Sequence, residues 1–260
     1  ASPCQGEGRE FESRHPLHFN PGPFAAGIIL LRMVLSATDI LGPVLSPNQR
    51  ETRAAMVMTL FGAFGRNGTS GDLGNELDSA LLQQLRAWAD VVLVSSGTAA
   101  AEEYGPAETP IAVLSRSLDI DPSLGVFSGR DAIVVCPEQS LTDDKLAPQR
   151  TALKNAGARF ISSGDGSPSM ITEALHREGF NRIACEGGPS VYADMIGNDL
   201  LDVVHITLDP TASAADGPWG LADIANQESF KRRYVLEATH TSPGEDDSML
   251  FLRYRSVRDE

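Results

Sequence analysis

Apolar and polar positions alternate along the chain with two periods, one typical of strands and one typical of helices. Short runs of β-branched and other apolar residues predict strands at residues 51–60, 91–95, 111–114, 132–136, 158–161, 182–185 and 203–208. Apolar residues at helical spacing predict helices at residues 78–90, 141–156, 168–178 and 190–196. Because strand and helix alternate, we expect an α/β fold with a mostly parallel central sheet and helices on both faces. Residues 234–241 and 248–254 predict a C-terminal antiparallel strand pair.

The segment 78–90 has the clearest helical pattern, because its apolar residues at positions 81, 82, 85 and 88 fall on one stripe. Asp78 stands at its start, where a carboxylate serves as N-cap or as a partner of the helix dipole. A catalytic acid at the same position is the alternative. Arg86 is expected to pair with Asp90, one helical turn further on.

The first 32 residues differ from the rest of the chain. They mix Gly, Pro, Arg and Glu with little periodicity, so we expect an N-terminal arm over residues 1–32. Met33 is a candidate natural start, and under that hypothesis the arm is not native. Residues 33–260 are expected to form a single domain, because the alternation of elements continues without an internal repeat.

Composition narrows the classes of function. The chain of 260 residues carries 35 acidic and 21 basic residues, a formal net charge of −14. That acidity argues against nucleic acid and against anionic membranes as partners, since both require clustered Lys and Arg. The longest apolar run, residues 24–31, is too short to span a bilayer. A small molecule is therefore the expected partner.

The cysteines do not indicate a metal site or a disulfide framework. The three cysteines, Cys4, Cys136 and Cys185, have no partner at metal-ligand spacing, and no C-x-x-C motif is present. A zinc deaminase would pair an H-x-E with a P-C-x-x-C, and the H-x-E at residues 176–178 has no such partner in the sequence. We therefore expect no metal site and no disulfide framework. A sparse, odd set of cysteines indicates a reducing compartment, so a cytoplasmic location is expected.

The strongest local signal is the sequence RIACEGGPSV, in which a buried strand leads through two glycines into a helix. Gly187 and Gly188 allow a ligand to approach the backbone, and the helix that follows Pro189 and Ser190 offers free N–H groups to a phosphate. A strand-to-helix turn without a ligand is the alternative. Glu186, at the end of the strand, is a candidate catalytic or cofactor-contacting acid.

Two further segments resemble this arrangement. The strand VVLVS ends at a small-residue turn where Gly97 and Thr98 are candidate cofactor contacts, with an N-cap role for Thr98 as the alternative. The strand IAVL is followed by Ser115 and Arg116. Between residues 67 and 129 there are nine acids and only two bases, so Arg116 is a candidate clamp for an adenosine 2′-phosphate at the carboxyl edge of the sheet.

Taken in order, these pieces resemble one family. TLFGAFGRNGTSG, QLRAWADVVLVSSGTAAAEEYGP, IAVLSRS and GFNRIACEGGPSVYADMIGNDLLDVVHITLDP are similar to the riboflavin-pathway pyrimidine reductases. These are the reductase half of the bifunctional deaminase-reductase and its free-standing actinobacterial relatives. The combination of LRA-x-AD, GT, AE-x-YGP and EGGP carries the resemblance, which covers residues 50–255.

The resemblance implies a dihydrofolate-reductase-like fold, NADPH as cofactor and, commonly, a homodimer. It implies a substrate of the 5-amino-6-(5-phosphoribosylamino)uracil type, whose ribosyl group is reduced to ribityl by hydride transfer. The implied cofactor contacts are Gly97, Thr98, Ser115, Arg116, Glu186, Gly187, Gly188 and Pro189, with Ser190 beside them. Asp78 and Glu186 are the acids expected near the reacting end.

The chain departs from the family pattern on the substrate side. Phe61 replaces the acid of an S-x-D-G motif, Ala55 stands where Lys or Asn is usual, and Leu81 stands where many bifunctional members have Asp. A site built to bind a polar substrate loses affinity when a hydrogen-bond partner is removed. The alternatives are therefore another substrate or a non-catalytic NADPH-binding protein. A flavin- or nucleotide-binding doubly wound domain is a third possibility.

Overall fold

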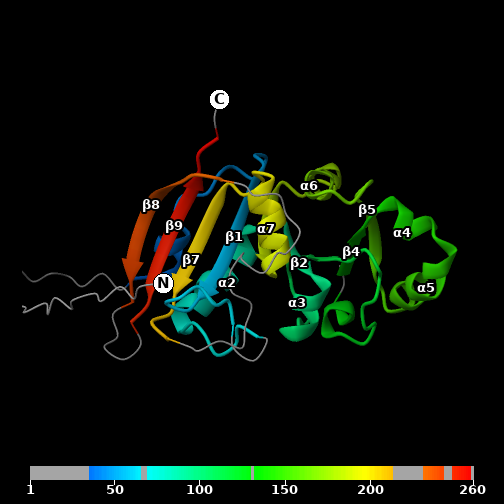
Figure 1. Cartoon of the computed structure of the whole chain (residues 1–260), viewed down its shortest axis with the longest axis horizontal. Helices are drawn as coiled ribbons and strands as arrows, with labels where there is room; N and C mark the ends of the chain where they lie inside the picture. The colour runs from blue at the N-terminus through cyan, green and yellow to red at the C-terminus, as the bar shows by residue number, and fades with distance from the viewer. Residues whose placement is uncertain (1–34, 66–68, 130–131, 213–230, 243–247, 259–260) are drawn as a thin grey trace, which may run out of the picture. The chain divides into compact units, whose positions relative to one another are not determined.

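The computed structural model describes residues 35–65, 69–129, 132–212, 231–242 and 248–258. Within these residues, nine strands form one sheet in the order β5-β4-β3-β2-β6-β1-β7-β9-β8 (Figure 1). The strands are β1 (Glu51–Met58), β2 (Val91–Ser95), β3 (Ile111–Leu114), β4 (Ala132–Cys136), β5 (Arg159–Ser162), β6 (Arg182–Gly187), β7 (Val203–Leu208), β8 (Tyr234–Thr241) and β9 (Leu250–Ser256).

The seven strands from β1 to β7 are mutually parallel, and β9 joins β7 and β8 in antiparallel fashion. This arrangement confirms the predicted mostly parallel sheet and C-terminal antiparallel pair. Strand β6 lies between β2 and β1, which precede it by about 90 and about 130 residues, so segments distant in sequence are neighbours at the middle of the sheet. The expected arm over residues 1–32 lies outside the described residues.

Helices pack on both faces of the sheet, as predicted. They are α1 (Ala37–Leu41), α2 (Glu76–Trp88), α3 (Ser96–Ala101), α4 (Glu138–Thr142), α5 (Ala147–Asn155), α6 (Pro168–Arg177) and α7 (Pro189–Gly197), with short 3₁₀ turns at Gly125–Ser128 and Asp144–Leu146. One core cluster contains the buried residues of α1, α2, α3 and α5, and the other contains those of α6 and α7. The strands β2, β4 and β6 alternate their side chains between the two clusters, so both faces are apolar.

Two of the predicted helices differ from their expected extents by more than one residue at an end. The predicted helix 141–156 is divided into α4 and α5, which a 3₁₀ turn separates, and Pro148 stands within the first turn of α5, where its missing N–H costs nothing. Helix α2 begins at Glu76, because Asn75 is its N-cap and accepts the N–H groups of Leu77 and Asp78. The expected N-cap role of Asp78 is therefore wrong.

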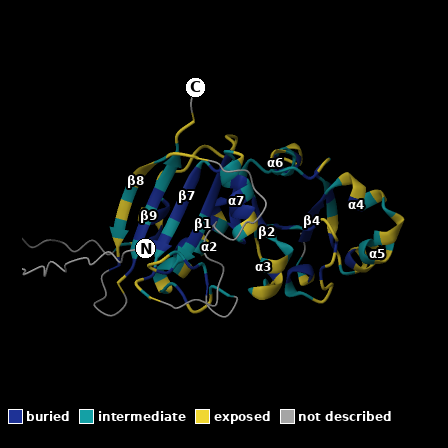
Figure 2. Ribbon diagram, viewed as in Figure 1, coloured by how far each residue is buried: buried dark blue, intermediate teal, exposed yellow. Residues whose placement is uncertain are grey.

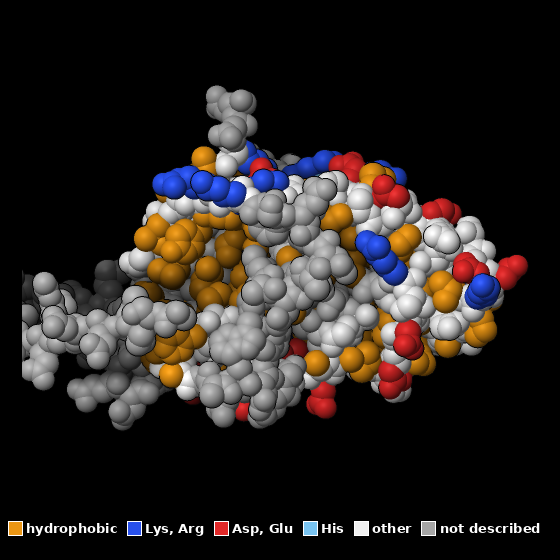
Figure 3. All heavy atoms as spheres, in the orientation of Figure 1, with side chains coloured by type: hydrophobic (Ala, Val, Ile, Leu, Met, Phe, Trp, Pro, Cys, Tyr) orange, Lys and Arg blue, Asp and Glu red, His pale blue; other side chains and the backbone are white. Residues whose placement is uncertain are grey.

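Burial decreases toward one edge of the sheet. Strands β1, β2 and β7 are largely buried, whereas β8 is mostly exposed (Figure 2). Figure 3 shows hydrophobic side chains over the β7–β9–β8 region and a row of Lys and Arg at the end where β8 begins. Among the described residues, no helix is both long and apolar enough to cross a membrane.

Candidate active site

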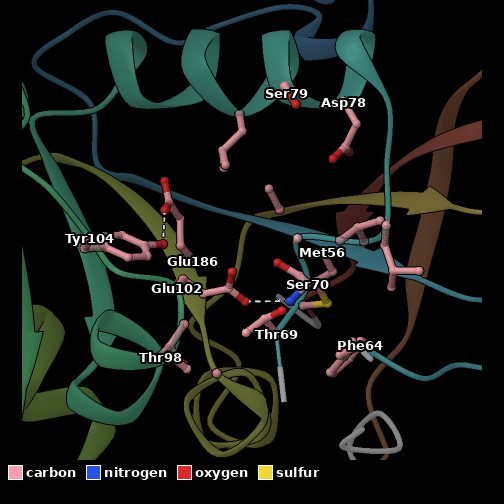
Figure 4. Close-up of a pocket in the computed structure, with 18 of the residues that line it drawn as sticks. Met56, Phe64, Thr69, Ser70, Asp78, Ser79, Thr98, Glu102, Tyr104 and Glu186 are labelled. Atoms are coloured by element: carbon pink, nitrogen blue, oxygen red, sulfur yellow. Dashed lines mark hydrogen bonds between the residues drawn. The ribbon is translucent and has the colours of Figure 1, made fainter. Parts of the chain in front are cut away.

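A cavity of about 470 Å³ opens where the strands β1, β2 and β6 end. Helix α2 forms one side of it, and the turns that follow β2 and β6 form another. In Figure 4, Asp78 points into this cavity from α2, while Glu186 and Tyr104 meet on another side. In parallel α/β folds, ligands bind at the carboxyl ends of the strands, at the point where the connections of adjacent strands run in opposite directions.

The β6–α7 turn brings backbone close to the cavity. Gly187 and Gly188 have φ values of +67° and +86°. A Cβ atom on Gly188 would stand 2.5 Å from the Thr98 hydroxyl and 2.9 Å from the Ser95 hydroxyl, so only glycine fits there. Helix α7 has no side-chain cap, which leaves the N–H groups of its first turn available to a ligand.

The turn after β2 lies directly beside these glycines. The Ser95 hydroxyl caps α3 by accepting the Thr98 N–H at 3.0 Å, so the alternative that Thr98 is the N-cap is wrong. Ser95 also donates to the Thr98 hydroxyl at 2.9 Å. Gly97, Thr98, Gly188 and Pro189 all line the cavity. Two of the three candidate ligand-binding segments, the β2–α3 turn and the β6–α7 turn, therefore lie at the same cavity.

Arg86, Glu186 and Tyr104 form a connected group on the cavity wall. Arg86 donates two hydrogen bonds to the Glu186 carboxylate, at 2.7 and 2.6 Å, and Tyr104 donates a third. The Glu186 side chain is 3% exposed. Burial, reinforced by the charge of Glu186, raises the pKa of Tyr104, so this phenol stays protonated and donates.

The expected Arg86–Asp90 pair is wrong. Helix α2 ends at Trp88, so Asp90 lies beyond it and no longer faces the preceding turn. The Asp90 carboxylate instead binds the Arg182 guanidinium at 2.6 and 3.1 Å and the N–H groups of Asn181 and Arg182. Arg86 is left to reach Glu186, which is 100 residues away in sequence.

Asp78 lies at a second group of polar residues. Its half-buried carboxylate has Thr207 and Asp209 as neighbours. Burial, with the negative charge of Asp209, raises the pKa of Asp78, although the neighbouring Thr207 hydroxyl opposes that change. A carboxyl group with a raised pKa at a cavity wall is suited to donating a proton.

Arg116 and Ser115 lie outside the cavity, at the carboxyl end of β3. Arg116 is exposed, and its guanidinium donates to the Gly166 carbonyl at 3.2 Å, just before α6. The Ser115 hydroxyl is buried and accepts the Leu118 N–H at 3.0 Å. Ser115 therefore shapes a turn, whereas the guanidinium of Arg116 lies exposed at the sheet edge. Ser190 is exposed in the first turn of α7.

The three departures from the family pattern occupy different places. Ala55 and Leu81 line the cavity, and the Ala55 carbonyl accepts the Tyr192 hydroxyl at 2.6 Å. Phe61 is 71% exposed on a tight turn closed by a hydrogen bond from the Gly62 N–H to the Thr59 carbonyl. Phe61 is not among the described residues that line the cavity.

Sequence reasoning missed several residues of the site. Glu102 and Tyr104 line the cavity, and Glu102 accepts the Ser70 N–H at 2.7 Å from the Gly-rich loop. Both acid and phenol belong to the AE-x-YGP motif, which is the signal that could have identified them. Within the described residues, no group of His, Cys, Asp and Glu is arranged to hold a metal ion.

Known proteins are similar to this chain in sequence and in fold. Residues 52–223 match the RibD C-terminal domain. The 2,5-diamino-6-ribosylamino-4(3H)-pyrimidinone 5′-phosphate reductase of Methanothermobacter thermautotrophicus is 24% identical over 200 residues, which are 69% of this chain and 90% of that relative.

Two solved structures are similar in fold. A pyrimidine reductase-like protein from Corynebacterium diphtheriae has a TM-score of 0.75 and 27% identity, covering 86% of this chain and 100% of that one. RibD of Acinetobacter baumannii has a TM-score of 0.62 and 15% identity, covering 81% of this chain and 59% of that longer one. The chain therefore belongs to the family of the RibD C-terminal domain, the riboflavin-pathway pyrimidine reductases that its motifs predicted.

Proposed function

We propose that this protein is an NADPH-dependent reductase of riboflavin biosynthesis that acts on a 5-amino-6-(5-phosphoribosylamino)uracil type of substrate. Beyond family membership, one observation carries the proposal: a single cavity joins the Gly187–Gly188 turn to a wall that carries Asp78, Ser79 and Arg86. The glycine turn and helix N-terminus suit a dinucleotide phosphate. The polar wall suits the sugar and base of a small substrate.

The residues at the β6–α7 turn fit a dinucleotide, because Gly188 leaves no space for a Cβ atom and α7 has no side-chain cap. Gly187, Gly188 and the N-terminus of α7 would hold the pyrophosphate, and Thr98 would line the nicotinamide side. Arg116 would bind the adenosine 2′-phosphate. When bound, the nicotinamide supplies the hydride.

Asp78 would supply the proton of the reaction. Reduction of an opened ribosylimine to a ribitylamine adds a hydride to carbon and a proton to nitrogen. The raised pKa of Asp78 favours the protonated carboxyl that this step requires. Glu186 already accepts hydrogen bonds from Arg86 and Tyr104, so in this proposal it orients the Arg86 guanidinium toward the cavity.

A titration tests the proposal directly. NADPH and NADH are added separately to the protein, with tryptophan fluorescence reporting binding, and the aminouracil ribosyl phosphate is then added while cofactor oxidation is followed. Saturable binding that prefers NADPH, with oxidation on addition of substrate, is the expected result. Tight NADPH binding without oxidation would overturn the proposed reaction but would support the assignment of NADPH as the cofactor. If neither cofactor binds, both parts of the proposal fail.

The variant Arg116→Ala tests the 2′-phosphate assignment. Loss of a charge-assisted contact should weaken NADPH binding by about tenfold or more, whereas NADH binding should barely change. Lys145→Ala is the control, because it removes one positive charge from the exposed turn Asp144–Leu146. Equal losses for both cofactors in Arg116→Ala would contradict the assignment.

A further inference from the structure

Two carboxylates from distant parts of the chain meet beside the cavity. Asp78 lies in the first turn of α2, and Asp209 directly follows β7. Asp209 is only 5% exposed. Its two oxygens accept the backbone N–H groups of Thr211 at 2.8 Å and Gly74 at 3.1 Å, so the carboxylate is fixed in place.

Gly74 is in contact with both acids. Its N–H binds Asp209, and a Cβ atom on it would stand 2.6 Å from an oxygen of Asp78. The φ of Gly74 is +83°, a conformation that favours glycine. The two carboxylates are therefore held against the same backbone residue. Thr207, on β7 two residues before Asp209, acts on the same carboxyl and favours its ionised form.

The other charged groups near Asp78 are placed differently. Glu76 is exposed on the outer side of α2. Glu186 lines the same cavity, but its charge is paired with Arg86. Glu102, also at the cavity, accepts the Ser70 N–H. Among the described residues, Asp209 is the neighbour whose charge raises the pKa of Asp78, while Thr207 acts in the opposite direction.

We propose that Asp209 is a positioning residue that keeps a proton on Asp78, and that the Thr207 hydroxyl limits this effect. Two negative charges held against one glycine repel each other, and protonation of the more accessible carboxyl relieves the repulsion. Both oxygens of Asp209 already accept backbone N–H groups, and Asp78 is the acid of the two that lines the cavity, so the proposal places the proton on Asp78. The coupling of the two acids does not depend on the proposed reductase function; only the donation of the Asp78 proton to a substrate rests on it.

The first test is a ¹³C NMR titration of aspartate carboxyl groups in the full chain, with the Asp78 signal assigned by its absence in Asp78→Asn. In Asp209→Asn, the Asp78 titration should move to lower pH, because the repelling charge is gone. In Thr207→Val, it should move to higher pH, because the neighbouring hydroxyl, which favours the ionised form, is gone. A general disturbance of the fold would not shift the two variants in opposite directions.

The second test is the pH dependence of substrate reduction. The rate should fall as pH rises through the titration of Asp78. This alkaline limb should move to lower pH in Asp209→Asn and to higher pH in Thr207→Val. Opposite NMR shifts without any reductase activity would overturn the proposed function and support the coupling of the two acids. An unchanged Asp78 titration in Asp209→Asn would overturn the inference, whatever the activity.

Discussion

At the scale of single residues, His205 is the least satisfied polar group of the core. It is 1% exposed on β7, and neither ring nitrogen has a hydrogen-bond partner in the described part of the chain. Arg53 and Arg253 face it from the neighbouring strands β1 and β9. Burial, with these two positive charges, lowers the pKa of His205 to about 3.

Replacing this histidine should change how stability depends on pH. The unfolded chain protonates His205 near its ordinary pKa, whereas the folded chain does not. The free energy of unfolding therefore falls as pH drops from about 6.5 toward about 3, by up to about 1.4 kcal/mol per pH unit. His205→Leu should remove this contribution, as measured by urea unfolding at several pH values between 3.5 and 8. An unchanged difference between pH 8 and pH 4 would contradict the prediction.

Residue identity alone could not decide the pairings within the site. The Arg86–Asp90 spacing satisfies the helical rule, but it fails because α2 stops at Trp88. The true partner of Arg86 is Glu186, which comes within reach because β6 inserts beside β2. Local rules describe neighbours in sequence, and this pair depends on strand order. The candidate acids could be named from the sequence, whereas their partners required the fold.

At the scale of elements, the β6–α7 turn is the part of the site that local sequence described best. A buried strand, two glycines and a proline predicted a strand-to-helix turn, and the structure has β6 ending at Gly187 and α7 beginning at Pro189. The first residue of α2 was harder to predict, because Asn75 and Asp78 are both residue types that commonly serve as N-caps. Only the backbone conformation at Gly74 and Asn75 decides between them.

The variant Gly188→Ala should damage this turn in particular. Its methyl group would meet the Thr98 and Ser95 hydroxyls at 2.5 and 2.9 Å, and its φ of +86° is unfavourable for alanine. We expect a loss of stability of about 1–2 kcal/mol and a much larger loss of NADPH affinity. Thermal unfolding and the fluorescence titration measure the two effects separately.

Gly179→Ala is a matched control for that variant. Gly179 follows α6 with a φ of +91°, but a Cβ atom there has no neighbour within 4 Å. The backbone strain is therefore similar, and the clash is absent. Gly179→Ala should lower stability and leave NADPH affinity unchanged. If both variants lost the same affinity, the turn at Gly188 would have no special role in binding.

At the scale of the whole molecule, the cavity exists only when the sheet is assembled. Its walls include α2, the β2–α3 turn and the β6–α7 turn. The two turns are neighbours because β6 lies between β1 and β2 in the sheet. A ligand of this cavity binds the folded state and has no site in the unfolded chain. Binding energy should therefore appear as global stability.

We expect NADPH at one hundred times its dissociation constant to stabilise the folded chain by about 2.7 kcal/mol. For a domain of this size that corresponds to a rise in Tm of about 5–10 °C. Calorimetry with NADPH, with NADH at the same concentration and with no addition measures the effect, and the rise with NADPH should exceed that with NADH. Arg116→Ala should reduce the NADPH rise to the NADH level, because the difference between the two cofactors is the 2′-phosphate alone. Saturation by fluorescence without any rise in Tm would mean that NADPH binds outside the cooperative sheet, since a ligand held by turns on both β2 and β6 cannot remain bound when those strands separate.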